Sequence, residues 1–280
     1  MLSFFSTLFY NICKEKIIRK SGGLLENKIM EINYKIYVDL MRKKKVDKQL
    51  VKTYKLIYSL IQRGYINESY SLIRSLYEEI LYELAITADH NYSITIKTEP
   101  KEIRNKVIDN IDLLFSDSID DSFIKEIYKY LSKMTHETMI KELLKDMLLN
   151  KKLSSFMIVN STYILLIIGY VFLNHIYIDL EEIELVDYLM IISTYVLMNE
   201  TVKLNAGLTK DEINRYSNYF VDINDKQYVS KINEELVSGI STIDNNDFNN
   251  TMNEISKKTD ELLKKYKYYN IVLKLLNQND

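Results

Sequence analysis

Apolar residues recur at three- and four-residue spacing along almost the whole chain, which is the period of helices that bury one face. An alternating pattern, typical of a half-buried strand, occurs in the short segment Tyr92–Lys97, which we expect to be a loop. We therefore predict an all-α bundle of about ten to twelve helices. The predicted helices cover residues 2–19, 24–44, 46–63, 67–89, 100–115, 119–135, 137–150, 153–178, 182–204, 209–219, 225–240 and 245–277.

The most apolar of these segments, 153–178, contains no Asp, Glu, Lys or Arg. It is long enough to cross a bilayer, which takes about 20 residues. Polar residues nevertheless lie toward its two ends, namely Ser154, Ser155, Asn160, Ser161, Thr162, Asn174 and His175. We expect this segment to be the central core helix of the bundle, because helices that are apolar all round also occur inside large helical domains. A membrane-associated effector that uses 153–178 is the alternative.

The last predicted helix, 245–277, has the most regular spacing of apolar residues, alternately four and three. Its seam consists of Phe248, Met252, Ile255, Thr259, Leu262, Tyr266, Tyr269, Leu273 and Leu276. We expect this seam to pack on the rest of the chain, with a homodimer or another protein partner through 245–277 as the alternative. The predicted organisation is a helical core domain over 1–205 and a C-terminal helical region over 206–280, packed on the core or used in oligomerisation.

Several predicted helix starts carry residues that satisfy the free amides of a first turn. They are Ser118 with Asp121 and Thr209 with Glu212, at capping-box spacing, Asn67 as an N-cap, and Pro100 in a first turn.

The composition supports the helical class, because one Pro and six Gly leave few of the residues that hairpins require. Thirty-seven basic residues against 39 acidic ones give a net charge of −2, so contact with RNA or lipid needs a local patch. One Cys and three widely separated His make no disulfide or metal-binding spacing. We expect no metal, no cofactor and a cytoplasmic location. The first residues are apolar but lack the basic start and cleavage site of a secretory signal.

Two segments carry candidate chemistry, and the first is the helix predicted over 67–89. Arg74 and Glu78 lie one turn apart on this helix, about 40° from each other around its axis. Leu81 and Ala85 share that sector, so we expect it to be half buried. The pair is either a surface ion pair that adds a few tenths of a kcal/mol or an Arg held by Glu to bind an anion bidentately.

The second segment is the helix predicted over 119–135. Tyr128, Ser132 and His136 follow one another at four-residue steps, so their side chains are expected to form one ridge. Tyr128 and Ser132 border the apolar stripe and are expected to donate or accept hydrogen bonds inside the bundle. His136 is either a helix-end residue that interacts with the dipole or a general acid and base.

The stretch IRSLYEEILYEL, followed about fifty residues later by YKYLSKMTHE, resembles the signature of a family of helical bacterial proteins. Their core is an Arg-x3-Glu helix and a Tyr-x2-Leu-Ser-x3-His helix, and they are similar in outline to the HEPN superfamily and to abortive-infection proteins. The resemblance covers about residues 50–150. The matching positions are Arg74, Glu78, Tyr128 or Tyr130, Leu131, Ser132 and His136.

The resemblance implies a bacterial antiviral effector, abortive-infection or toxin-like, with RNA as its candidate substrate. HEPN ribonucleases carry an Arg and a His four to six residues apart on one helix, and this chain has no such pair. A metal-independent ribonuclease would therefore need Arg74 to contact the phosphate from a different helix than His136. The predicted catalytic residues are Arg74, Glu78, Tyr128, Ser132 and His136. A non-catalytic helical sensor or protein-interaction module is the competing prediction.

Overall fold

The computed structural model describes residues 24–89, 94–95, 97–115, 119–175 and 180–220. Within these ranges the chain forms α-helices and one 3₁₀ helix, with no strand, which confirms the all-α class there. The elements are α2 (Leu24–Lys43), α3 (Lys48–Gln62), α4 (Ile66–Ala88), α5 (Pro100–Ile108), α6 (Ile111–Leu114), α7 (Asp121–Met134), α8 (Glu137–Leu149), α9 (Lys151–His175), α10 (Leu180–Asn205), α11 (Lys210–Tyr216) and η1 (Ser217–Tyr219). The helices predicted at 2–19, 225–240 and 245–277 lie outside the described residues.

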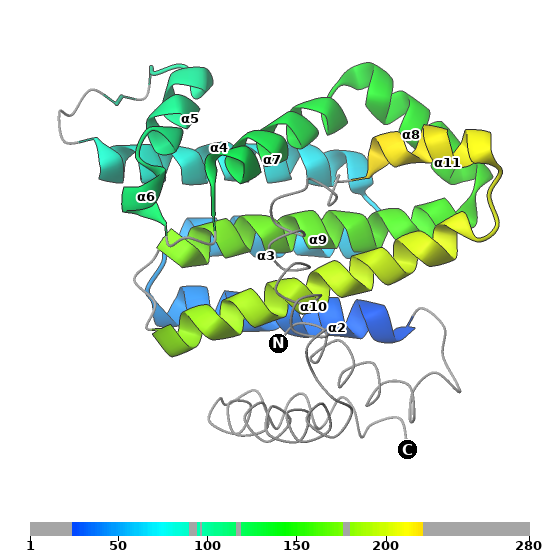
Figure 1. The fold of residues 1–280 in the computed structure, drawn as a ribbon, viewed down its shortest axis with the longest axis horizontal. Helices are drawn as coiled ribbons and strands as arrows, with labels where there is room; N and C mark the ends of the chain where they lie inside the picture. The colour runs from blue at the N-terminus through cyan, green and yellow to red at the C-terminus, as the bar shows by residue number, and fades with distance from the viewer. Residues whose placement is uncertain (1–23, 90–93, 96, 116–118, 176–179, 221–280) are drawn as a thin grey trace, which may run out of the picture. The chain divides into compact units, whose positions relative to one another are not determined.

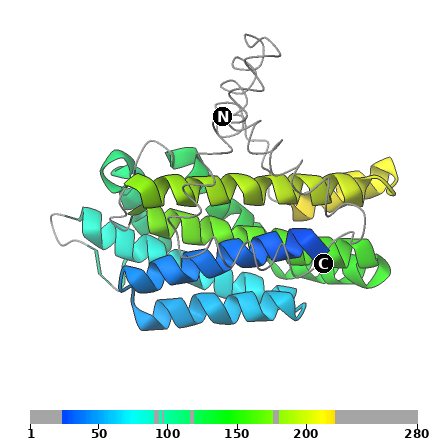
Figure 2. The same cartoon turned by 90° about the horizontal axis from the view of Figure 1, so that it is seen from below.

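The apolar helix α9 is the centre of the compact unit Asn33–Val221. It packs against α3, α4, α8 and α10, and Figure 1 shows it between α4 and α10. Figure 2 shows α10 and α3 on opposite edges of this unit. Among the described helices α9 alone is long and apolar enough to cross a membrane, yet 94% of its most apolar window is buried inside the protein. The prediction of a central core helix is confirmed.

The boundary between α3 and α4 is set by Gly64, which has a positive φ of 80°. The Gly64 amide donates to the Ile61 carbonyl, and the Tyr65 amide donates to the Leu60 carbonyl, the pattern of a Schellman motif. The next helix therefore begins at Ile66 with Tyr65 as its N-cap. The prediction of Asn67 as N-cap is wrong for this reason.

Of the other predicted helix starts, two are confirmed and one is wrong. Thr209 and Glu212 form the predicted capping box, and Pro100 occupies the first turn of α5. The N-cap of α7 is Asp120, whose carboxylate accepts the amide of Phe123 at 2.8 Å, so the predicted cap at Ser118 is two residues too early. Aspartate is as good an N-cap as serine, so spacing alone did not separate the two.

The helix predicted over 100–115 is two helices, α5 and α6, which meet at Asp109 and Asn110. The side-chain amide of Asn110 donates to the Lys106 carbonyl at 2.8 Å, in the place where an uninterrupted helix would use the backbone amide of Asn110. α5 therefore stops early and lies as a short separate helix against α4. A buried ion pair holds it there, since the Asp89 side chain is 2% exposed and lies 3.3 Å from Lys106.

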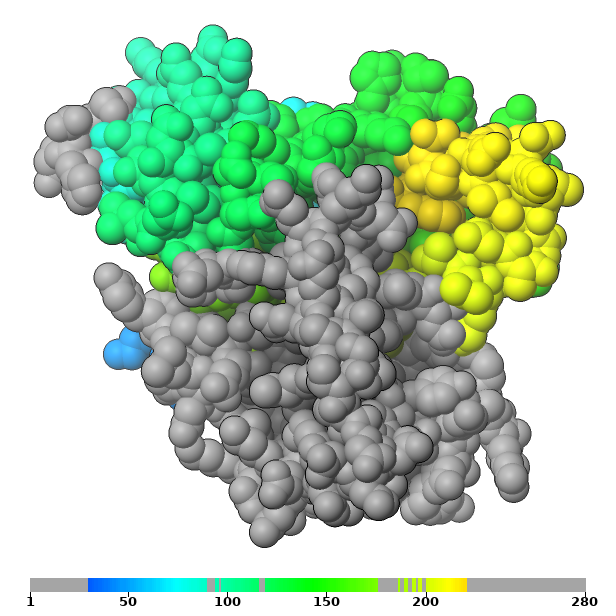
Figure 3. Space-filling model, in the orientation of Figure 1, coloured from blue at the N-terminus to red at the C-terminus, as the bar shows by residue number. Residues whose placement is uncertain are grey.

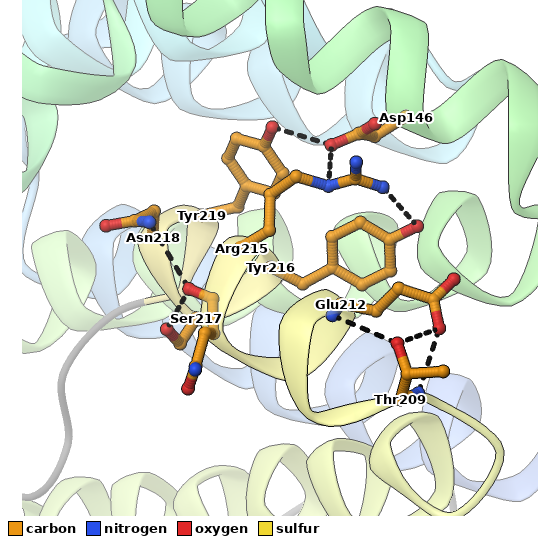
Figure 4. A network of polar contacts seen from close by, with 9 residues as sticks. Asp146, Thr209, Glu212, Arg215, Tyr216, Ser217, Asn218 and Tyr219 are labelled. Atoms are coloured by element: carbon orange, nitrogen blue, oxygen red, sulfur yellow. Dashed lines mark hydrogen bonds and ion pairs between the residues drawn. The ribbon is translucent and has the colours of Figure 1, made fainter.

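One of the groups that attach residues 210–219 to the bundle is a buried carboxylate, as Figure 4 shows. Asp146 of α8 is buried, accepts the Tyr219 hydroxyl at 2.8 Å and lies 3.1 Å from the Nε of Arg215. The described part of the predicted C-terminal region, up to residue 220, is thus attached to the core. The predicted boundary near 205 and the use of 245–277 in oligomerisation stay predictions, because the rest of that region lies outside the described residues.

Buried tyrosines make stability sensitive to alkali. Burial raises the pKa of Tyr34 from 10.0 to about 12, and it raises the pKa of Tyr54 and of Tyr130 well above 10.0. Above pH 10 the unfolded chain releases protons that the folded chain retains, so stability is fully present below that pH and falls as pH rises from 10 toward 12 and beyond. We expect tyrosinate absorbance to rise together with loss of the helical circular dichroism signal. Titration of these tyrosines near pH 10 with intact helices would contradict this.

Candidate functional site

The predicted pair on α4 is an ion pair at the edge of the bundle. The Nε of Arg74 donates to a carboxylate oxygen of Glu78 at 3.0 Å, across one helical turn. The two side chains are 36% and 33% exposed, so the pair is half buried as the sequence predicts. The hydrogen bond to Glu78 is the main cause that raises the pKa of Arg74 above its ordinary value. Arg74 is therefore a permanent cation with one of its donors already used.

A second donor of Arg74 reaches the end of α7. Its Nη1 donates to the hydroxyl of Thr135 at 3.0 Å. The single proton of that hydroxyl points to the carbonyls of Leu131 and Ser132, at 2.9 and 3.2 Å, so the oxygen is free to accept from Arg74. Arg74 thus connects α4 to the C-terminal end of α7. Thr135 was not singled out from the sequence, because a contact between residues 61 apart has no local signal.

Tyr128 lies between two arginines. The Cζ of Arg74 is 5.7 Å from the centre of the Tyr128 ring, and the Cζ of Arg104, from α5, is 4.6 Å from it. Both distances are within the range of cation–π attraction. Arg104 was not predicted as a site residue, since only the packing of α5 on α4 brings it to Tyr128. Figure 3 shows the surfaces of α5 and α7 adjoining on one face of the molecule.

The charges of this cluster do not balance. Glu78 is the carboxylate within 4.0 Å of Arg74, and no carboxylate of the described residues lies within that distance of Arg104. Both guanidinium groups therefore contact the Tyr128 ring, but only that of Arg74 is paired with a carboxylate of the described residues. An arrangement with one uncompensated guanidinium can bind an oxyanion, because the planar fork of Arg matches carboxylate and phosphate groups.

The other two predicted site residues differ in their placement. Ser132 is half buried, lies one turn beyond Tyr128 on α7, and its hydroxyl makes no hydrogen bond within the described part of the chain. His136 is exposed and lies beyond the end of α7, which stops at Met134. It is the N-cap residue of α8 with an extended backbone (φ −74°, ψ 131°) and no side-chain capping bond.

The prediction of one ridge formed by Tyr128, Ser132 and His136 is therefore wrong for His136. At the end of α7 the amide of His136 bonds to the Lys133 carbonyl at 3.1 Å, three residues back, and the backbone of His136 is extended. His136 nonetheless directly follows Thr135, the residue that Arg74 contacts. Its predicted role as acid and base stays a prediction.

The hydrogen bonder in the bundle interior is Tyr130, two residues from Tyr128. Its hydroxyl lies 2.7 Å from that of Tyr70 on α4, accepts from Asn160 of α9 at 2.8 Å, and donates to the carbonyl of Tyr219 at 2.9 Å. All of these side chains are buried. This cluster, Tyr70–Tyr130–Asn160, holds α7 against α4 and so positions the two helices that carry Tyr128 and Arg74. The prediction of Tyr128 as the interior hydrogen bonder is not supported by these contacts.

The described residues contain no group of three or more His, Cys, Asp or Glu side chains arranged to hold a metal ion. The contacts described above bring together two guanidiniums, one phenol and one carboxylate. Such groups can bind a negative charge and stabilise one that develops during a reaction.

Comparison of the chain with protein-family models, with curated proteins and with solved structures gives no match. The resemblance to HEPN and abortive-infection proteins stays a prediction that rests on its short motifs. Any proposal of function for this chain therefore rests on its own residues and their geometry.

Proposed function

We propose that this protein is a bacterial antiviral effector that binds RNA at the cluster of Arg74, Arg104 and Tyr128 and cleaves it without a metal. The observation that carries the proposal is the pair of guanidiniums beside one tyrosine ring, of which only that of Arg74 is paired with a carboxylate of the described residues. A phosphodiester offers the negative charge that the cluster lacks. The proposal places the protein in the cytoplasm, where RNA is available.

In this proposal His136 is the general base. It takes the proton of a ribose 2′-hydroxyl, the 2′-oxygen forms a bond to phosphorus, and the bond from phosphorus to the 5′-oxygen breaks. The leaving 5′-oxygen takes a proton from water, and the product is a cyclic phosphate. The guanidiniums stabilise the negative charge that grows on the phosphate oxygens in the transition state. Glu78 and Thr135 orient Arg74 through the two hydrogen bonds described above.

Inducible expression of the protein in bacteria tests this proposal, with growth and the integrity of cellular RNA compared with and without the inducer. We expect the wild type to arrest growth and to fragment RNA, and we expect His136→Ala to lower cleavage by about 100-fold or more, the usual contribution of a general base. Arg74→Ala is expected to lose activity as well. Arg63→Ala, an exposed arginine at the end of α3, is the matched control and should remain toxic. Intact RNA with the wild type, or undiminished cleavage by His136→Ala, would refute the proposal.

A second candidate function, a non-catalytic interaction module, is favoured by the C-terminal end of α8. Leu148 and Leu149 are 86% and 74% exposed, and Leu144, one turn before Leu148, is 37% exposed. Exposed leucines on one helix end are typical of a surface that contacts another protein. A module of this kind would tolerate His136→Ala and would lose its partner when Leu148 is made charged, so the same two variants separate the candidates.

A further inference from the structure

Arg104 has hydrogen-bond donors that the protein does not use. Its Nε is buried and has no partner among the described residues. Its two terminal nitrogens form no hydrogen bond or ion pair with the described residues and are not buried, so they reach solvent. A guanidinium carries five donors and no acceptor, so it can be satisfied only by an oxygen from a ligand, from water or from another residue. Side chains in the described part of the chain supply none.

Arg74, in contrast, uses two of its nitrogens in hydrogen bonds within the protein. Its Nε is taken by Glu78 and its Nη1 by Thr135, both at 3.0 Å. Glu78 also neutralises much of its charge for a ligand outside. Arg74, which was predicted from the sequence, thus mainly connects α4 to α7. Arg104, which was not predicted, is the cation available to a ligand.

The position of Arg104 is held by the packing of its helix. Ile103 and Val107, on the two sides of Arg104 along α5, are 9% and 0% exposed. Lys106 pairs with the buried Asp89 at the end of α4. The guanidinium then lies 4.6 Å from the Tyr128 ring centre, close enough for the ring to hold its plane. A cation fixed in this way loses little conformational freedom when it binds a ligand.

We infer that Arg104, supported by the Tyr128 ring, is the residue that binds the phosphate oxyanion at this site, and that Arg74 positions α7 beside it. The ligand is a phosphodiester group of single-stranded RNA, bound through the terminal nitrogens of Arg104. This inference rests on the proposed function, whose substrate contact it identifies, but it requires binding only and no cleavage. The planar fork of Arg explains why Lys at this position would bind less well.

Calorimetric titration of the full-length protein tests the inference, with a short single-stranded oligoribonucleotide and with inorganic phosphate as separate probes. We expect Arg104→Gln to weaken oligoribonucleotide binding by about 10-fold or more, because one good phosphate contact is lost. The affinity of Arg104→Lys should lie between those of the wild type and Arg104→Gln. The slope of log K against log salt should become shallower by about 0.7, as one phosphate contact to a single strand is removed. Arg63→Gln, an exposed arginine elsewhere, should leave both quantities unchanged.

Thermal unfolding of each variant shows that a loss of binding is not a loss of fold. If the wild type binds the oligoribonucleotide but does not cleave it, the ribonuclease proposal is refuted and this inference is still supported. Binding by Arg104→Gln at wild-type strength and salt slope would overturn the inference, even if the protein cleaves RNA. Binding of inorganic phosphate as strongly as of the oligoribonucleotide would overturn the assignment to RNA. A larger loss of oligoribonucleotide binding in Arg74→Gln than in Arg104→Gln would overturn the division of roles between the two arginines.

Discussion

Replacement of Tyr130 by phenylalanine is expected to lower the free energy of unfolding by about 2 to 4 kcal/mol, although it removes a single oxygen. That hydroxyl contacts Tyr70 at 2.7 Å, Asn160 at 2.8 Å and the Tyr219 carbonyl at 2.9 Å. All three partners are shut off from water in the bundle interior. Each partner that loses its bond there costs roughly 1 to 3 kcal/mol.

The directions of these hydrogen bonds follow from the number of protons. Tyr130 has one hydroxyl proton, and the Tyr219 carbonyl can only accept, so Tyr130 donates to Tyr219. Tyr70 must then donate to Tyr130, while the amide of Asn160 donates to both hydroxyls. Because the bonds share atoms, the hydroxyls of Tyr70 and Tyr130 are coupled. The double variant Tyr70→Phe/Tyr130→Phe should therefore lose less stability than the sum of the two single variants.

Urea unfolding followed by circular dichroism measures these losses. Tyr65→Phe is the control, since the Tyr65 side chain is 52% exposed and should change stability by less than about 0.5 kcal/mol. A cost for Tyr130→Phe as small as that of Tyr65→Phe would contradict the network. Additive losses in the double variant would show that the two hydroxyls act independently.

The pattern of apolar residues predicted the helices well because burial of one helix face is a local property of the sequence. α9 is the clearest case, since residues 153–175 contain no Asp, Glu, Lys or Arg and neighbouring helices cover this apolar surface. The split of 100–115 escaped prediction because it depends on one side-chain hydrogen bond, from Asn110 to Lys106. Such a bond competes with the helix without altering the apolar spacing.

The candidate site was predictable only in part. The ion pair of Arg74 and Glu78 follows from their spacing, and it forms. Tyr130 had a local signal, because it lies three residues after Ile127 and four before Met134, within the buried stripe of α7. The motif alone matched Tyr128 or Tyr130, and only Tyr128 was predicted as a site residue. Arg104 had no local signal, since its contact with Tyr128 depends on how α5 packs.

The close approach of α9 to its neighbours depends on Gly169. A Cβ at this position would lie 2.6 Å from the Tyr54 hydroxyl oxygen and 2.8 Å from Cδ2 of Tyr37. Both tyrosines are 0% exposed, so neither ring can turn into solvent to make room. The Tyr54 hydroxyl also donates to the carbonyl of Leu165 on α9, at 3.1 Å, and any shift would strain that bond. Gly169 is therefore required by contact and not by its backbone angles.

Gly169→Ala is expected to lower the free energy of unfolding by about 2 to 3 kcal/mol, the cost of overpacking a well-filled core, even though alanine is the better helix former. Gly207→Ala is the matched control, because the nearest atom there is the flexible end of Lys152 at 3.3 Å. Tyr54→Phe removes the closest clash and leaves its ring carbon at 3.1 Å, so the variant Gly169→Ala/Tyr54→Phe should recover part of the loss. Equal stability of Gly169→Ala and Gly207→Ala in urea unfolding would show that α9 does not approach Tyr54 this closely.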